Sequence, residues 1–110
     1  MSKEVLLKVC KIVSDEVGVT PKVLRSQSRK QQLVFGRMIF VIICRNKFNI
    51  KTNDIADYFG LTIGSIYAYL KNCSIELKHN AVFRKDYESI LERINKNKAL
   101  TKGVKSNQRR

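Results

Sequence analysis

The chain has 110 residues, 44% of them hydrophobic, which suits one folded domain with a modest core and excludes two. It carries 22 Lys and Arg against 9 Asp and Glu, giving a formal net charge of +13. A folded domain this basic repels itself unless a polyanion binds it, and the usual polyanion is nucleic acid. An anionic membrane is the weaker alternative, because no predicted helix is basic on one face and aromatic on the other.

The sequence gives little support to catalysis, metal binding or membrane insertion. Cys10, Cys44 and Cys73 are widely spaced and His79 is the single histidine, so we expect reduced thiols in a cytoplasmic protein, with no metal and no cofactor. No nucleophile motif occurs, so we expect no catalytic residue, no enzyme activity and no small-molecule substrate. The longest apolar run, residues 38–44, is far shorter than the ~20 residues of a membrane span, and nothing resembles a signal peptide.

Hydrophobic periodicity predicts an all-α fold, a compact bundle of about six helices. The segment after residue 30 is apolar on nearly all sides, which is typical of the central helix of a small bundle. Its β-branched residues would also suit a buried strand, but the sequence offers no second strand to pair with it. We expect helices over about residues 3–17, 21–26, 31–47, 52–59, 62–71 and 81–95, with a loop over residues 72–80.

Short-range signals indicate where two of these helices begin. Thr20 precedes Pro21, and a Thr cap followed by Pro is a typical helix start. The short helix that follows is expected to turn Val23 and Leu24 toward the core. For the helix that begins near residue 52, either Thr52 or Asn53 is the expected N-cap.

Residues 52–71 carry the spacing of a helix-turn-helix. Ala56 is small at the point where two helices must approach closely. Gly60 follows the first helix, where the backbone needs a positive φ, and Ile66 points back from the second helix toward the first. The second helix of such a motif enters the major groove of DNA, so double-stranded DNA is the expected partner.

The positive charge is concentrated in the first half of the chain. No acidic residue lies between Glu16 and Asp54. Cations that meet phosphates release counterions, so this interval is expected to contact the DNA backbone. The final segment, residues 96–110, holds six basic and no acidic residues, and we expect a disordered tail after a domain at residues 1–95 that keeps +7 (+13 minus 6). The eight cations of the interval are Lys22, Arg25, Arg29, Lys30, Arg37, Arg45, Lys47 and Lys51.

The expected recognition helix, residues 62–71, is unusual for a base reader. It has no Arg, Asn or Gln to form bidentate hydrogen bonds with guanine or adenine. Thr62, expected as its N-cap, Ser65 and the Tyr67 hydroxyl offer single hydrogen bonds. Ala68 offers a methyl contact with thymine.

Two further positions of this helix carry expectations. Gly64 lets the backbone approach DNA closely, although it costs ~1 kcal/mol of helix propensity against Ala. Ile63 lies three residues before Ile66, so we expect it in the core, while its first-turn position leaves a base contact open. Lys71 is expected on the outer face.

Three stretches of the sequence carry a family resemblance: Val-Thr-Pro-Lys-Val-Leu at 19–24, Ser-Arg-Lys-Gln-Gln at 28–32 and Asp-Ile-Ala-Asp-Tyr-Phe-Gly at 54–60. With the order of helices, they resemble the C-terminal DNA-binding domain of the bacterial replication initiator DnaA, in the Trp-repressor-like superfamily. The resemblance covers about residues 5–94. It implies a helix-turn-helix DNA-binding protein, a replication or transcription regulator, acting in a bacterial cytoplasm, nucleoid-associated or encoded by a mobile element.

The resemblance also implies roles for single residues. In that family the basic loop puts an arginine into the minor groove, a role that would fall to Arg29. Arg37 is a further candidate for DNA contact, and Ser28 and Lys30 would contact phosphates.

The sequence departs from the family in the recognition helix and in length. The family has a Gly-Arg/Lys-Asp-His-Thr-Thr-Val stretch there, whereas residues 61–66 read Leu-Thr-Ile-Gly-Ser-Ile, one residue shorter, with Ser65 as the counterpart of a threonine. A Gly-x-x-x-x-Gly-Lys-[Ser/Thr] motif of an ATPase module is absent, so we expect a stand-alone relative.

The leading hypothesis is that the chain binds double-stranded DNA in a sequence-specific way. This hypothesis is compatible with an additional protein partner. The alternative is a non-catalytic protein- or RNA-interaction module on the same fold, for which Arg29→Ala and Arg37→Ala would leave duplex affinity unchanged. The expected DNA-binding residues are Ser28, Arg29, Lys30, Arg37, Lys51, Thr62, Ile63, Gly64, Ser65, Tyr67, Ala68 and Lys71.

Overall fold

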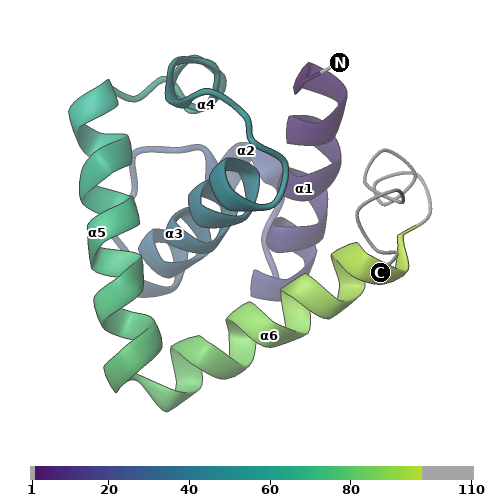
Figure 1. Ribbon diagram of the computed structural model, residues 1–110, viewed down its shortest axis with the longest axis vertical. Helices are drawn as coiled ribbons and strands as arrows, with labels where there is room; N and C mark the ends of the chain where they lie inside the picture. Colours follow the sequence, from purple (N-terminus) through teal and green to yellow (C-terminus); the bar gives the residue numbers. More distant parts are fainter. Residues whose placement is uncertain (1, 98–110) are drawn as a thin grey trace.

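The computed structural model describes residues 2–97, and these residues form six helices and no strand. The expected all-α fold is confirmed, while the expected tail lies, from residue 98 onward, outside the described residues. Helix α3 runs through the middle of the molecule, with α1 and α5 on its two sides, α4 above it and α6 below it (Figure 1). The helices are α1 (Ser2–Val17), α2 (Pro21–Leu24), α3 (Gln31–Asn46), α4 (Thr52–Phe59), α5 (Ile63–His79) and α6 (Ala81–Lys96).

The central position of α3 follows from its composition. Residues 36–44 are buried without a break, because α3 packs against every other helix. An isolated helix that is apolar all round would expose much of this surface, so α3 depends on its neighbours for stability. The interpretation of this segment as a helix and not a strand is confirmed.

Within the described part of the chain, no helix is long and apolar enough to cross a membrane.

The short helix α2 begins as expected, but it buries fewer side chains than expected. The Thr20 hydroxyl oxygen accepts a hydrogen bond from the Val23 backbone N–H at 3.2 Å. Leu24 is fully buried, whereas Val23 is 41% exposed, so the inward orientation expected for Val23 was wrong. A helix of a single turn can bury one side only, and Leu24 occupies that side beside Gly36, where an added Cβ would lie 3.0 Å from the Leu24 Cδ1.

Helices α4 and α5 form the expected helix-turn-helix. Ala56 is 4% exposed and Ile66 is fully buried, so the close approach of the two helices is confirmed. Gly60 has φ +69° and ends α4 in the left-handed conformation, and the next N–H, that of Leu61, bonds to the Ala56 carbonyl at 2.9 Å. Gly60 therefore forms the tight turn that sets the direction of α5.

The start of α4 differs from the expectation. The helix begins at Thr52 itself, and Lys51 occupies the N-cap with no side-chain hydrogen bond. Neither Thr52 nor Asn53 is the cap. Asp54 lies in the first turn, where its carboxylate opposes the positive end of the helix dipole.

Helix α5 is longer than the sequence pattern suggested. It continues to His79, so the loop expected over residues 72–80 was wrong. Buried Cys73 and partly buried Leu77 extend the apolar spacing set by Ile66, and this continued packing keeps the segment helical. The chain turns only at Asn80, whose side-chain oxygen accepts a hydrogen bond from the Phe83 N–H at 3.1 Å and caps α6.

The three cysteines belong to the core. Cys10, Cys44 and Cys73 are buried and unpaired. Burial raises the pKa of all three thiols, that of Cys73 to about 12. Such thiols stay protonated near neutral pH and act as small apolar side chains.

Candidate nucleic-acid interface

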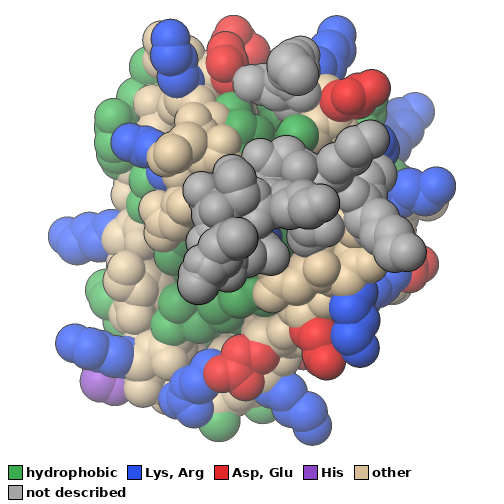
Figure 2. Space-filling view, turned by 45° about the vertical axis from the view of Figure 1, so that its right-hand side comes forward, with side chains coloured by type: hydrophobic (Ala, Val, Ile, Leu, Met, Phe, Trp, Pro, Cys, Tyr) green, Lys and Arg blue, Asp and Glu red, His purple; other side chains and the backbone are tan. Residues whose placement is uncertain are grey.

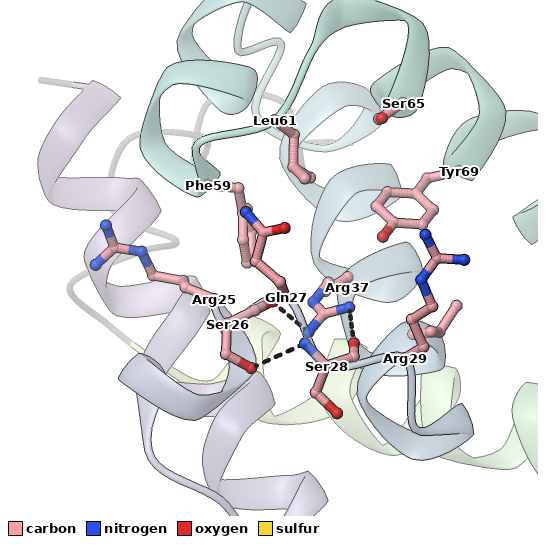
Figure 3. A pocket seen from close by; sticks show the side chains of 11 residues that line it. Arg25, Ser26, Gln27, Ser28, Arg29, Arg37, Phe59, Leu61, Ser65 and Tyr69 are labelled. Atoms are coloured by element: carbon pink, nitrogen blue, oxygen red, sulfur yellow. Dashed lines mark hydrogen bonds between the residues drawn. The ribbon is translucent and has the colours of Figure 1, made fainter.

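The chain between α2 and α3, residues 25–30, is termed the basic loop, and a buried arginine holds it in place. Arg37 in α3 donates three hydrogen bonds to backbone carbonyl oxygens: Nε to Leu24 at 2.7 Å, Nη1 to Ser28 at 2.8 Å and Nη2 to Ser26 at 2.6 Å. In Figure 3 dashed lines join its guanidinium group to Ser26 and Ser28 of the loop. Hydrogen bonds from a charged donor are the stronger kind, so these three restrict the loop to one path.

This placement changes the role expected for Arg37. Its side chain is only 4% exposed, and three of its five N–H groups already bond to carbonyls. The carbonyls of Leu24 and Ser26 lie at the end of α2, where a helix leaves acceptors unsatisfied. Arg37 therefore positions the loop, and the DNA contact expected for it stays a prediction.

The loop also carries two internal hydrogen bonds. The Ser26 hydroxyl oxygen accepts from the Ser28 N–H, and the Ser28 hydroxyl oxygen accepts from the Lys30 N–H, both at 3.3 Å. Arg29 and Lys30 are exposed at the tip of the loop. Within the described residues, neither side chain forms an ion pair. Their charges are available to an external anion.

Arg25, at the start of the loop, is tied to the helix-turn-helix. Its Nε donates a hydrogen bond to the Tyr58 carbonyl at 3.1 Å, and its guanidinium carbon lies 4.4 Å from the centre of the Tyr58 ring. The ring face attracts the cation. Burial, followed by the nearby Cys10, raises the pKa of Tyr58 to about 12, so this ring stays neutral. Arg25 thereby joins the basic loop to α4.

A hollow of about 400 Å³ separates the basic loop from the first turns of α5. In Figure 3 the loop residues lie below it, and Leu61, Ser65 and Tyr69 lie above it. None of the described residues that line it is acidic. The lining residues are Arg25, Ser26, Gln27, Ser28, Arg29, Val34, Arg37, Phe59, Leu61, Ser65 and Tyr69.

The start of α5 is capped as expected. The Thr62 hydroxyl oxygen accepts a hydrogen bond from the Ser65 N–H at 3.1 Å, and the Thr62 hydroxyl donates to the Ser65 Oγ at 3.1 Å. Ser65 also lines the hollow. The N-terminal end of a helix also carries partial positive charge, which favours an anion nearby.

The outer face of α5 carries exposed apolar groups. Tyr67 is 57% exposed, and Gly64, Ala68 and Lys71 are exposed as well. Ile63 is 43% exposed, so the core position expected for it was wrong. With 3.6 residues per turn, Ile63 is rotated about 60° from the buried Ile66, which is enough to carry it from the seam with α4 to the edge of the helix.

The structure brings together some of the expected site residues and separates others. Ser28, Arg29, Arg37 and Ser65 line the hollow. Lys30 adjoins it in the loop, whereas Lys51 lies at the far end of α4 from Phe59, the α4 residue in the lining.

Other lining residues were missing from the expected site. Arg25 belongs to the cationic interval that the sequence revealed, so its charge was the available signal. Gln27 and Tyr69 carried no comparable signal, because their place depends on the fold of the loop against α5.

Elsewhere the surface has mixed charge. Arg93 of α6 pairs with Asp15 at 2.8 Å and with Glu16 at 3.0 Å, both on α1. On the face drawn in Figure 2, acidic side chains lie among the basic ones. The hollow differs from this ordinary surface because its cations face no carboxylate, and it is therefore suited to a polyanion.

Comparison with known proteins identifies the family. The family model described as bacterial dnaA protein helix-turn-helix matches residues 7–65, more than half of the chain. The chromosomal replication initiator protein DnaA of Campylobacter concisus (strain 13826) is 30% identical over 96 residues, which cover 86% of this chain and 21% of that protein. That of Campylobacter curvus (strain 525.92) is 27% identical over 99 residues, covering 89% and 22%.

No solved structure matches the chain. The chain spans about a fifth of the length of these two curated relatives. The family match includes the basic loop, α3, α4 and the turn, and it ends at Ser65, in the first turn of α5. The chain thus belongs to the bacterial DnaA helix-turn-helix family and carries a DNA-binding helix-turn-helix.

Proposed function

We propose that this chain is a non-catalytic module that binds double-stranded DNA, with the basic loop against the sugar–phosphate backbone and minor groove and α5 in the major groove. The family supports duplex DNA as the partner, since the matched residues include the loop and the helix-turn-helix. The docking follows the general geometry of such motifs, in which the second helix enters the major groove.

The cationic hollow between the loop and α5 is the observation that carries the proposal. Arg25 and Arg29 come from one side of it, and Ser65 and Tyr69 come from the other. A strand of DNA that separates a minor groove from a major groove would run along such a hollow, with its phosphates facing guanidinium and hydroxyl donors. Most contacts that position a protein on duplex DNA are of this kind.

Each residue group has a separate part in the proposal. Arg29 enters the minor groove, and Ser28 and Lys30 contact the adjacent phosphates. Arg37 acts through the loop that it holds. Lys51, at the N-terminus of α4, meets the backbone on the other side of the motif, because first helices of this kind cross the backbone there.

The biological role that we propose is regulation of replication or transcription through sequence-specific binding of bacterial DNA in the cytoplasm. The names of the relatives, chromosomal replication initiator proteins, favour replication. Because the chain spans only about a fifth of those proteins, the proposal extends to DNA binding and not to the initiation reaction.

The test is fluorescence anisotropy with a labelled mixed-sequence duplex across a salt series. With about four phosphate contacts, affinity should fall about a hundredfold between roughly 50 and 200 mM salt, because each neutralised phosphate adds close to −0.9 to the slope of log affinity against log salt. Binding that does not respond to salt would contradict the proposal. Equal or tighter binding of a single-stranded RNA of the same length would favour the RNA-interaction alternative.

A further inference from the structure

The exposed outer face at the start of α5 is apolar. It consists of Ile63, Gly64, Tyr67 and Ala68 and is termed the reading surface. Ile63 and Tyr67 are 43% and 57% exposed. Neither belongs to the hydrophobic core, and neither packs against it as a partly buried residue. The fold therefore leaves this surface free for a partner.

The reading surface lacks the groups that usually identify bases. From Thr62 to Lys71 there is no Arg, Asn, Gln, Asp, Glu or His. These side chains form the paired hydrogen bonds that distinguish guanine, adenine and cytosine in the major groove. The Tyr67 hydroxyl is the single polar group on the surface, so what remains for recognition is almost entirely contact with apolar groups.

We infer that the reading surface recognises thymine, through contact of Ile63, Tyr67 and Ala68 with the C5-methyl groups of a thymine-rich target. This inference rests on the proposed function. The thymine methyl is the apolar group that the base pairs present in the major groove. Burial of one such group against an aliphatic or aromatic side chain contributes free energy without any hydrogen bond.

The backbone at Gly64 allows the close approach that methyl contacts need. A Cβ added there would meet nothing nearer than the Thr62 Oγ1 at 3.8 Å, so the fold itself does not require a glycine. A glycine in an exposed helix normally lowers stability. An incoming duplex would use the space that the missing side chain leaves, beside Ile63 and Ala68.

Charge favours DNA over an apolar protein surface as the occupant. Lys71 lies on the exposed side of α5 one turn beyond Tyr67, and on another side of the same helix Arg25 and Arg29 line the hollow together with Ser65 and Tyr69. An apolar surface beside a lysine, on a helix that also borders a cationic hollow, suits the edge of a base pair, which lies between two rows of phosphates. Tyr67 and Ala68 lie beyond Ser65, where the family match ends.

The experiment compares duplexes that differ in the methyl group alone. An alternating dA·dT duplex is prepared with thymine or with deoxyuridine, which pairs in the same way and leaves the minor groove and phosphates unchanged. Loss of the methyls should weaken binding about fourfold for each one that the protein buries. In an alternating dG·dC duplex, 5-methylcytosine places a methyl at the same position, and it should tighten binding.

Variants assign the effect to the reading surface. In Ile63→Ala and Tyr67→Ala the ratio of thymine to deoxyuridine affinity should fall toward one, while Tyr67→Phe should keep it. Val82→Ala, which shortens another exposed apolar side chain at the start of α6, should keep the full ratio.

The outcomes show whether thymine recognition alone fails or whether DNA binding fails as well. Equal affinity of the wild-type chain for both duplexes, with steep salt dependence retained, would overturn thymine recognition and leave DNA binding standing. A ratio that survives both alanine substitutions would also overturn it. Failure to bind any duplex would remove the proposed function and this inference together.

Discussion

The basic loop and the reading surface differ in how they are held in place and in the kind of side chain that they expose. Hydrogen bonds to Arg37 and Tyr58 fix the path of the loop, whose exposed side chains are charged. The reading surface lies on a regular helix, and its exposed side chains are mostly apolar. Charge acts at a distance on every phosphate, whereas an apolar contact responds to one group at one position.

The comparison separates the sources of affinity and specificity. Cations on the loop would supply binding strength to any duplex, and this contribution depends on salt. The reading surface would add a smaller contribution that depends on sequence. The family match covers the loop and ends at the first turn of α5, so it includes the proposed source of affinity and only the start of the reading surface.

Removal of Arg37 is expected to give the largest effect, because the loop loses the three hydrogen bonds that hold it in place. Arg37→Ala leaves the carbonyls of Leu24, Ser26 and Ser28 without their donor. We expect the free energy of unfolding to fall by about 3 kcal/mol and duplex affinity to fall with it. Urea denaturation followed by circular dichroism measures the first quantity, and anisotropy measures the second.

Two matched variants show whether geometry or charge is lost. Arg37→Lys keeps the charge, but one ammonium group cannot reach three separated carbonyls, so it should recover little stability. Arg45→Ala removes an exposed cation from the same helix and should change stability by less than about 0.5 kcal/mol. If Arg37→Ala were as stable as Arg45→Ala, the positioning role would be refuted.

The framework of the interface could be predicted from sequence because its signals are local. Ala56, Gly60 and Ile66 predicted the helix-turn-helix, and Thr62 predicted the cap of α5. Each depends on backbone conformation or helical spacing within a few residues. The structure confirms all of them.

The parts that could not be predicted depend on contacts between distant segments. The family resemblance suggested Arg37 as a DNA contact, but its hydrogen-bond partners lie up to 13 residues away in a loop whose path the sequence does not specify. Ile63 was expected in the core because it lies three residues before Ile66, yet it is 43% exposed. A loop was expected over residues 72–80, although Cys73 continues the buried face of α5. The sequence supplied the residue types at these positions, but the orientations of the side chains could not be predicted from it.

Removal of Arg29 tests the loop's charge without disturbing its shape. The side chain is exposed and forms no ion pair within the described residues, so Arg29→Ala should leave stability within about 0.5 kcal/mol of the wild type. Duplex affinity should fall about tenfold, and the salt slope should decrease in magnitude by about one. Anisotropy titrations at several salt concentrations measure both.

The matched control is Lys11→Ala, which removes one exposed cation from the face where Asp15 and Arg93 lie. It should keep nearly the full affinity and salt slope. Equal losses in the two variants would mean that net charge alone, and not the loop, attracts the duplex.

The smallest expected effect concerns Gly64 and separates binding from folding most clearly. Gly64→Ala should raise the free energy of unfolding by up to about 1 kcal/mol, since open space surrounds the new Cβ. It should nevertheless lower duplex affinity a few-fold, because the methyl group occupies space that the duplex needs. Gly36→Ala is the contrast: its Cβ would lie 3.0 Å from Leu24 and 3.2 Å from Val17, so stability should fall by about 1 kcal/mol. Thermal denaturation and anisotropy on both variants give the comparison. A more stable Gly64→Ala chain with undiminished affinity would show that the duplex does not approach α5 at this point.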